Sequence, residues 1–254
     1  MRPIDPSGAI AGPLGARLSS ALEWRLLRDS LPRNEQLKRI EVLDFGVSGN
    51  GHQGGRLVSV RQLEKTASSD RRKSIWLAAF SASAMAEKKG SLRILELGTC
   101  LGAGALSLIL GAQGRCHYIG LEGSPDLARM TEHRIRRAAP GVPVEMHVGP
   151  FETTLPAVLK DAVRFDLVFL DGHHVGRVLL DQWEQIRPRL SEGAWVLIDD
   201  IRWSADMYAA WNVLMEKEDV LAFDLFRMGA LRFSAPATCP KEPSPSRVPL
   251  SLIA

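Results

Sequence analysis

Acidic and imidazole side chains lie at or just beyond the ends of two apolar runs of this sequence, at 165–171 and 194–200, that are typical of buried strands. Asp171 ends the first run and is followed by His173 and His174, and Asp199 and Asp200 end the second run, with Arg202 just outside. In an open parallel sheet the carboxyl ends of the strands meet at one edge, so these side chains are expected to converge there. Carboxylates at that density repel one another unless a cation or a proton lies between them. The pattern therefore indicates a chemically active rim.

A structural explanation of the same aspartates is also open. Aspartates at strand ends often cap the next helix by accepting its backbone N–H groups. Asp171 would then cap a helix near Val178, and Asp200 would cap the helix after Trp203. In that case only a ligand site elsewhere on the sheet edge would be functional.

A glycine-rich turn provides such a site, in the stretch ILELGTCLGAGAL at 94–106. The apolar run ends at Gly98, and the first turn after a strand of an open parallel sheet is the usual cradle for a ligand. Gly102 and Gly104 let the loop backbone come close to the ligand and let the next helix begin facing it. The spacing is GxxxGxG rather than the GxGxxG of dinucleotide-binding folds, which counts against a nicotinamide cofactor.

Glu122 ends the next apolar run, in YIGLEG. An acid at this point can accept hydrogen bonds from both hydroxyls of a ribose, as in dinucleotide-binding folds. Alternatively, it interacts only with the macrodipole of the following helix, although Ser124 and Asp126 can serve that purpose. We therefore expect Glu122 to bind a ribose.

Strands and helices alternate from residue 92 onward, which places all these groups on one sheet. Five βα units with continuous apolar strands predict a parallel sheet covered by helices on both faces. Two further runs, 220–226 and 230–235, predict a closing antiparallel hairpin that turns at Met228-Gly229. The parallel strands are expected at 93–98, 117–123, 143–149, 165–171 and 194–200, and the helices at 103–112, 124–139, 153–162, 178–190 and 205–217.

The chain before and after this region differs in composition. Helical periodicity at 18–37 and 69–88, separated by a glycine-rich loop, predicts a helical lead-in. Both ends are rich in Pro with Gly, Ala or Ser, which is typical of segments without a packed core. The expected parts are a flexible N-terminus (1–16), a helical lead-in or cap (17–90), a main domain (91–234) and a disordered tail (235–254).

The overall composition is that of a globular protein of 254 residues, 45% hydrophobic and 24% charged. The net charge is only +3 and the two signs are interspersed, so no nucleic-acid partner is expected. Cys100, Cys116 and Cys239 lack disulfide or zinc spacing and favour a reducing compartment. No apolar stretch approaches the length of a membrane span, so a cytoplasmic location without membrane association is expected.

The turn ELGTCLGAG at 96–104 resembles motif I of the class I S-adenosylmethionine-dependent methyltransferases. Its ELGTxxG form is similar to the catechol O-methyltransferase-like and bacterial small-molecule O-methyltransferases. The resemblance spans roughly 92–234 and implies a Rossmann-like, doubly wound seven-stranded sheet, mostly parallel with the last strand antiparallel. A looser resemblance links Asp44-Phe45-Gly46 in the lead-in to a bacterial methyltransferase subgroup.

The resemblance implies that S-adenosylmethionine is the cofactor. Glu122 would hold its ribose, and Glu96 would lie near its cationic sulfonium or amino end. Pro150 departs from the polar residues that are usual beside the adenine. The residues that would line the methionine part are Gly98, Thr99, Gly102 and Gly104, and those near the adenine are Gly149 and Phe151.

The resemblance also implies roles for the rim. In catechol-type enzymes an acid after the fourth strand and an Asp-Asn pair after the fifth hold Mg²⁺, and a lysine three positions past the first acid takes the hydroxyl proton. Asp171 matches the first ligand and would also border the cofactor, while Asp199-Asp200 stands where Asp-Asn would. His174 stands at the position of the lysine, and histidine suits base catalysis near neutral pH. Whether Mg²⁺ or another divalent cation takes part stays open, because a bacterial branch with a DGxH signature carries the same acid and histidine.

These features predict a methyltransferase that O-methylates a small molecule, with Asp171, His174 and Asp200 assisting as base or metal ligands. One alternative is a methyltransferase acting on a macromolecule, although DGHH stands where amino-methylating nucleic-acid enzymes carry [DN]PP[YF]. A non-catalytic binding module that keeps the cofactor fold is another, and a nicotinamide-dependent oxidoreductase is disfavoured by the glycine spacing. Related enzymes are often dimers, so a homodimer is also considered.

Overall fold

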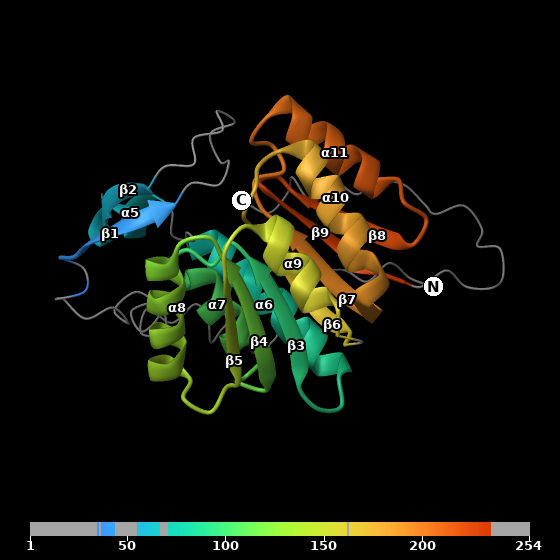
Figure 1. The fold of residues 1–254 in the computed structure, drawn as a ribbon. Coiled ribbons are helices and arrows are strands. Elements are labelled where there is room, and N and C mark those ends of the chain that lie inside the picture. The colour runs from blue at the N-terminus through green and yellow to red at the C-terminus, as the bar shows by residue number, and fades with distance from the viewer. Residues whose placement is uncertain (1–34, 36, 44–54, 67–70, 162, 235–254) are drawn as a thin grey trace.

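A seven-stranded sheet forms the centre of the protein, in a computed structural model that describes residues 35, 37–43, 55–66, 71–161 and 163–234 (Figure 1). Its strands are β3 (Leu92–Leu97), β4 (Cys116–Glu122), β5 (Val144–Val148), β6 (Phe165–Leu170), β7 (Leu190–Ile198), β8 (Val220–Leu225) and β9 (Met228–Phe233). They lie in the order β5-β4-β3-β6-β7-β9-β8. Strands β3 to β7 pair in parallel, and β9 is antiparallel to both of its neighbours. The predicted Rossmann-like sheet with an antiparallel last strand is confirmed.

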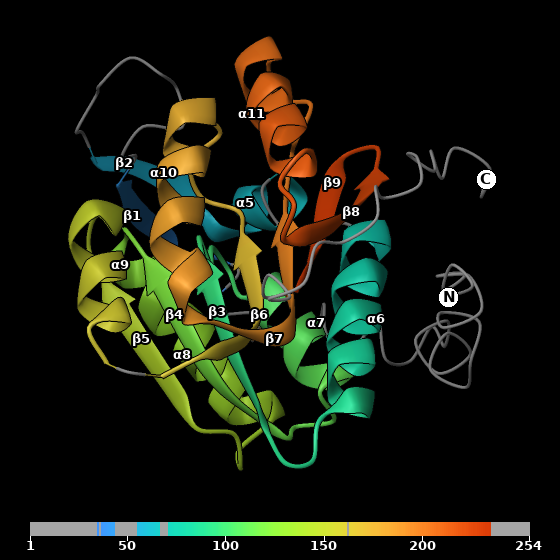
Figure 2. The ribbon, with the colours of Figure 1, turned by 90° about the vertical axis from the view of Figure 1, so that its right-hand side faces the viewer.

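Helices cover both faces of the sheet (Figure 2). Because successive strand residues point to opposite faces, Leu95 and Leu97 pack with one helical layer, and Leu92 and Ile94 pack with the other. None of the described helices is long and apolar enough to cross a membrane. One layer consists of α9 (Phe151–Leu159), α10 (Gly176–Ile186) and α11 (Ala205–Met215), and the other of α6 (Arg71–Glu87), α7 (Ala103–Gly111) and α8 (Pro125–Ala138).

Helix α6 crosses the whole height of the sheet. Lys73 in its first turn reaches Asp171 at the carboxyl end of β6, whereas Lys88, just beyond its end, reaches Asp166 at the start of the same strand. The first turn of α6 therefore lies at the edge where the parallel strands end, which is the edge that binds ligands in folds of this kind.

The lead-in contains strands as well as helices. Besides α6, which confirms the helix expected at 69–88, it forms β1 (Arg39–Leu43), β2 (Gly55–Ser59) and α5 (Val60–Thr66), with β1 and β2 paired antiparallel. Their apolar side chains form a separate small core with α8 and with Leu101 of the glycine-rich turn. The expected helix at 18–37 falls largely outside the described residues, and the N-terminus 1–16 and the tail 235–254 fall wholly outside them.

Two sequence-based boundaries are wrong. The hairpin turns at Phe226-Arg227 rather than at Met228-Gly229, because Leu225 pairs with Met228 and Phe226 adopts a left-handed φ of +71°. The helix expected at 178–190 ends at Ile186, and β7 begins at Leu190 after a short 3₁₀ turn. Pro188 in that turn has no N–H to donate to a continuing helix.

Gly111 sets the distance between α6 and α7. A Cβ at this position would collide with the carbonyl group of Ala78 in α6. We expect Gly111→Val to lower the free energy of unfolding by about 1–3 kcal/mol, because the added atoms overpack a buried helix contact. Urea unfolding of the variant measures this change. Gly141→Val is the control, because a Cβ at Gly141 meets no atom within 4 Å, and an equal loss in the two variants would contradict the packing explanation.

Candidate active site

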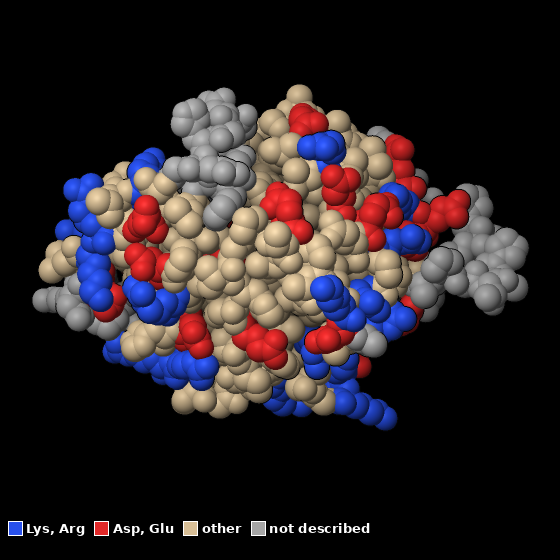
Figure 3. Space-filling model, in the orientation of Figure 1, with Lys and Arg blue, Asp and Glu red and all other residues tan. Residues whose placement is uncertain are grey.

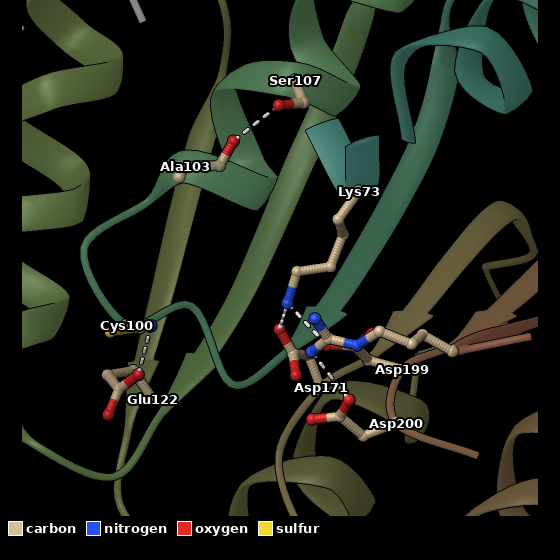
Figure 4. Close-up of polar contacts among 9 residues, drawn as sticks. Lys73, Cys100, Ala103, Ser107, Glu122, Asp171, Asp199 and Asp200 are labelled. Carbon is tan, nitrogen blue, oxygen red and sulfur yellow. Dashed lines mark hydrogen bonds and ion pairs between the residues drawn. The ribbon is translucent and has the colours of Figure 1, made fainter. Parts of the chain in front are cut away.

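The carboxylate of Glu122 is fixed at the carboxyl edge of β4. Its Oε2 accepts a hydrogen bond of 2.8 Å from the backbone N–H of Cys100, and its Oε1 accepts one of 3.0 Å from that of Ser124 (Figure 4 shows the first). Thr99 Oγ1 lies 3.4 Å from the same Oε2. Burial raises the pKa of Glu122, and these hydrogen bonds oppose that shift. A carboxylate has about four acceptor sites, so both oxygens can still accept ribose hydroxyls.

The glycines of the turn pack against other parts of the site. Gly98 has a left-handed φ of +88°, and a Cβ there would collide with the backbone of Asp171. Gly102, with φ +77°, is the N-cap of α7, and a Cβ at Gly104 would collide with the carboxylate of Glu96. These glycines therefore let the turn lie directly against the strand ends that carry the acidic groups.

The N-terminus of α7 suits the carboxylate end of an amino-acid ligand. Its N-cap residue, Gly102, supplies no side-chain hydrogen bond to the first helical N–H groups, which have no partner within the helix. Such N–H groups and the positive end of the helix dipole bind anions. Together with the Glu122 carboxylate, this uncapped helix start fits a ligand that carries both a carboxylate and a ribose, which S-adenosylmethionine does.

Glu96 lies beneath the turn, on the side of the sheet that faces α7. It is 1% exposed, and Tyr118 donates a hydrogen bond of 2.6 Å to its Oε2. Burial raises the pKa of Glu96 to about 8, although the Tyr118 hydrogen bond and the charge of Lys73 oppose the shift. Glu96 is therefore mostly protonated at neutral pH in the protein without ligand.

The raised pKa of Glu96 predicts a pH dependence of stability. Between pH 4.5 and about 8 the folded protein keeps a proton that the unfolded chain releases, so the free energy of unfolding falls as the pH rises through this window. Glu96→Gln retains a partner for Tyr118 but cannot titrate. We therefore expect its free energy of unfolding to fall less between pH 5 and pH 8, and to exceed that of the wild type at pH 8. Urea unfolding at pH 5 and pH 8 measures the difference, and parallel pH profiles of the two proteins would contradict the expectation.

A lysine lies between two of the rim aspartates. Lys73 Nζ is 2.9 Å from Asp171 Oδ2 and 2.5 Å from Asp199 Oδ2, and all three side chains are largely buried (Figure 4). Burial by itself lowers the pKa of Lys73, but the charges of the two aspartates outweigh it and raise the pKa above its ordinary value. Burial and the charge of Asp199 raise the pKa of Asp171, while Lys73 lowers it. The lysine therefore stays charged and neutralises part of the rim.

Asp200 is held apart from this group. It adopts a left-handed φ of +48°, and its Oδ1 lies 3.0 Å from a guanidinium nitrogen of Arg227. The capping explanation of the rim aspartates is wrong, because the N-caps of α10 and α11 are Val175 and Ser204. Ser204 Oγ accepts the N–H of Met207 in the usual capping manner.

The rim as arranged does not fit a divalent cation. Mg²⁺ needs several oxygen ligands in near-octahedral geometry, but Asp171 and Asp199 both direct an oxygen at Lys73, and Asp200 is paired with Arg227. Within the part of the chain that the structure describes, no group of three or more His, Cys, Asp or Glu side chains is placed to hold a metal ion.

His174 lies on the same edge, with its ring centroid 5.2 Å from that of Trp203. Burial lowers the pKa of His174, and the charge of Lys73 adds to this, although Asp200 and Asp199 oppose it. The imidazole is therefore neutral near pH 7 and able to take a proton. His173 instead packs edge-on against Phe151, at a centroid distance of 5.2 Å.

The expected adenine-side residues lie at the start of α9. Gly149 adopts a φ of +138°, and its N–H donates to the Glu122 carbonyl oxygen at 3.0 Å. The half-buried Phe151 ring packs against the main core, and a Cβ at Gly172 would collide with it. The structure thus brings this segment next to both Glu122 and the loop after β6.

Lys73 is the site residue that the sequence-based prediction missed. It lies about a hundred residues before Asp171 in the chain, in a lead-in expected only to cap the domain. One signal was present: Arg71, Arg72 and Lys73 open α6 with no acidic residue in its first turn. Helix N-termini ordinarily favour acidic residues, so three basic ones at that end indicate a partner outside the helix.

Comparison with known proteins agrees with this fold. Residues 95–201 match the family described as "Methyltransferase domain". The chain is 33% identical to the catechol O-methyltransferase of Mycobacterium tuberculosis over 109 residues, which are 43% of this chain and 48% of that protein. The aligned region therefore spans about half the length of this relative.

Solved structures share the fold. The O-methyltransferase TomG of Streptomyces achromogenes, in complex with S-adenosylmethionine, is 18% identical, with a TM-score of 0.57 over 68% of this chain and 86% of that one. An O-methyltransferase of Bacillus cereus in complex with S-adenosylhomocysteine is 18% identical, with a TM-score of 0.54 over 68% and 88%. The chain is therefore similar in fold to class I S-adenosylmethionine-dependent methyltransferases, and its residues 95–201 match a methyltransferase domain. The resemblance to methyltransferases that residues 96–104 carry is confirmed over residues 95–201.

Proposed function

We propose that this protein transfers the methyl group of S-adenosylmethionine to an oxygen atom of a small molecule. The observation that carries the proposal is the Glu122 carboxylate, which two backbone N–H groups fix beside the uncapped start of α7. The match to a catechol O-methyltransferase supports oxygen as the methylated atom. The interspersed positive and negative side chains on the face in Figure 3 support a small acceptor over a nucleic acid, which favours a continuous basic surface.

The residues divide into a cofactor half and an acceptor half. In the cofactor half, Glu122 binds the ribose hydroxyls, and the first N–H groups of α7 bind the amino-acid carboxylate. When bound, S-adenosylmethionine supplies a methyl group made electrophilic by its positively charged sulfur. In the acceptor half, neutral His174 accepts the proton of the acceptor hydroxyl, which leaves a nucleophilic oxygen. Positioning the two ligands on one edge contributes the rest of the rate enhancement.

Thermal unfolding with three ligands tests the cofactor. S-Adenosylhomocysteine and S-adenosylmethionine at about a hundred times their dissociation constants are expected to stabilise the protein by about 2.7 kcal/mol, and NAD is expected to have no effect. The absence of any shift with either adenosyl ligand at millimolar concentration would favour a binding module without this cofactor. A shift with NAD alone would indicate an oxidoreductase.

The acceptor is tested separately. Phenols, other hydroxylated small molecules, a peptide mixture and total RNA are each incubated with S-adenosylmethionine that carries a labelled methyl group. Label transfer to a small hydroxylated compound is expected, as an alkali-stable ether. Transfer only to peptide or RNA would replace the small-molecule acceptor with a macromolecular one, and the cofactor assignment would stand.

A further inference from the structure

We propose that the ammonium group of Lys73 takes the place between Asp171 and Asp199 that a divalent cation takes in metal-assisted methyltransferases, so that this site works without a metal ion. This proposal rests on the proposed function, and it identifies Lys73 as the positive charge that neutralises the aspartates in the acceptor half of the site. Lys73 Nζ lies within 2.9 Å of one carboxylate and 2.5 Å of the other (Figure 4). These two aspartates come from neighbouring strands, β6 and β7, and the lysine comes from the lead-in.

The position of Lys73 in its helix supports this role. A positive charge in the first turn of a helix opposes the macrodipole and is unfavourable there. The Lys73 side chain is also only 15% exposed, so its charge has lost most of its hydration. Neither cost is offset within α6, whose first turn has no acidic residue. Asp171 and Asp199 offset both costs, which makes the lysine and the pair of carboxylates one electrostatic unit.

The same unit leaves little room for a metal ion. The Lys73 ammonium lies within hydrogen-bonding distance of both carboxylates. A divalent cation bound by Asp171 and Asp199 would therefore lie close to this positive charge. Like charges that close repel strongly in a largely buried site. The third rim carboxylate, Asp200, forms its ion pair with Arg227 instead. Lys73 therefore acts as a positioning residue that holds Asp171 and Asp199 and keeps a fixed positive charge between them.

Removal of Lys73 is expected to create a metal site. Mn²⁺ is titrated calorimetrically into the wild type, Lys73→Ala and Lys88→Ala, with no adenosyl ligand present. Lys73→Ala should bind Mn²⁺ at least about tenfold more tightly than the wild type, because two buried carboxylates have lost their cation. Lys88→Ala is the matched control, since Lys88 pairs with Asp166 at 2.5 Å beside a hollow of about 590 Å³ at the opposite sheet edge. It should bind Mn²⁺ no better than the wild type.

Two activity measurements accompany the titration. Wild-type methyl transfer should be unchanged by EDTA, whereas the slower Lys73→Ala should be partly rescued by Mn²⁺. The proposal would be overturned if the wild type bound Mn²⁺ stoichiometrically and the Asp199→Asn variant did not. This test holds even if Lys73→Ala does not fold. Equal Mn²⁺ affinities of Lys73→Ala and Lys88→Ala would also overturn the proposal. Lys73→Met keeps the apolar stem of the side chain and serves to repeat the comparison. Failure of S-adenosylhomocysteine to bind would reject the proposed function alone, because the titration contains no such ligand.

Discussion

Replacement of His174 by alanine is expected to lower kcat for methyl transfer by about 10²–10⁴-fold, the usual contribution of a positioned general base. The affinity of the His174→Ala variant for S-adenosylhomocysteine should not change, because the cofactor half of the site is built around Glu122 and the start of α7. Steady-state kinetics and calorimetric binding measure the two quantities. A parallel loss of both would mean that His174 supports the structure of the site rather than proton transfer.

The neighbouring histidine provides the control. His173→Ala should retain most of the activity, because that ring packs against Phe151 rather than against the Trp203 side of the site. The pH profile gives a second check. His174 must be unprotonated to act, and burial lowers its pKa, so kcat/KM should fall only below the ordinary histidine value of about 6.5. Asp200→Asn should move this acid limb to still lower pH, because the Asp200 charge raises the pKa of His174.

Replacement of Glu122 by alanine is expected to weaken S-adenosylhomocysteine binding by about tenfold to a hundredfold, which corresponds to hydrogen bonds made to a charged group. Two losses combine in this variant. The ribose hydroxyls lose their acceptor, and the N–H groups of Cys100 and Ser124 lose theirs, so the turn is no longer held against β4. Calorimetric titration well below the melting temperature separates affinity from stability.

Two further variants make the Glu122 result specific. Glu122→Gln keeps one acceptor oxygen and should fall between the wild type and Glu122→Ala. Glu145→Ala removes an exposed acid of the neighbouring strand β5 that pairs with His117. This variant should bind S-adenosylhomocysteine as the wild type does. Wild-type affinity in Glu122→Ala would remove the ribose role from this residue and leave only its contacts with the turn.

The core of the fold was predictable because its signals are local. Continuous apolar strands that alternate with helices specify a parallel sheet covered on both faces, and the five predicted strands fall within a few residues of the observed ones. The hairpin turn was misplaced because its position depends on packing: Gly229 looks like a turn residue, but it lies in β9, where a Cβ would collide with the Trp211 ring. The strands β1 and β2 were missed because a short pair separated by a glycine-rich segment has a weak pattern.

Residue order alone places several acidic groups at the carboxyl edge of the sheet. Glu122, Asp171 and Asp199 each sit at or just beyond the end of an apolar strand, and parallel strands end at a common edge whatever the details of packing. The resemblance to methyltransferases also rests on a local pattern, since the glycine-rich turn at 96–104 is contiguous in the chain.

The balance of charges at that edge depends on contacts that form when the chain folds. The density of carboxylates indicated that a cation or a proton lies among them, but it did not distinguish a proton, a metal ion and a charged side chain. Lys73 reaches Asp171 across 98 positions of the sequence, because α6 crosses the sheet and delivers its first turn to the carboxyl edge. Coulomb interactions depend on distance in space and on burial, neither of which residue order records, so the partner of a buried charge becomes known only when the chain is folded.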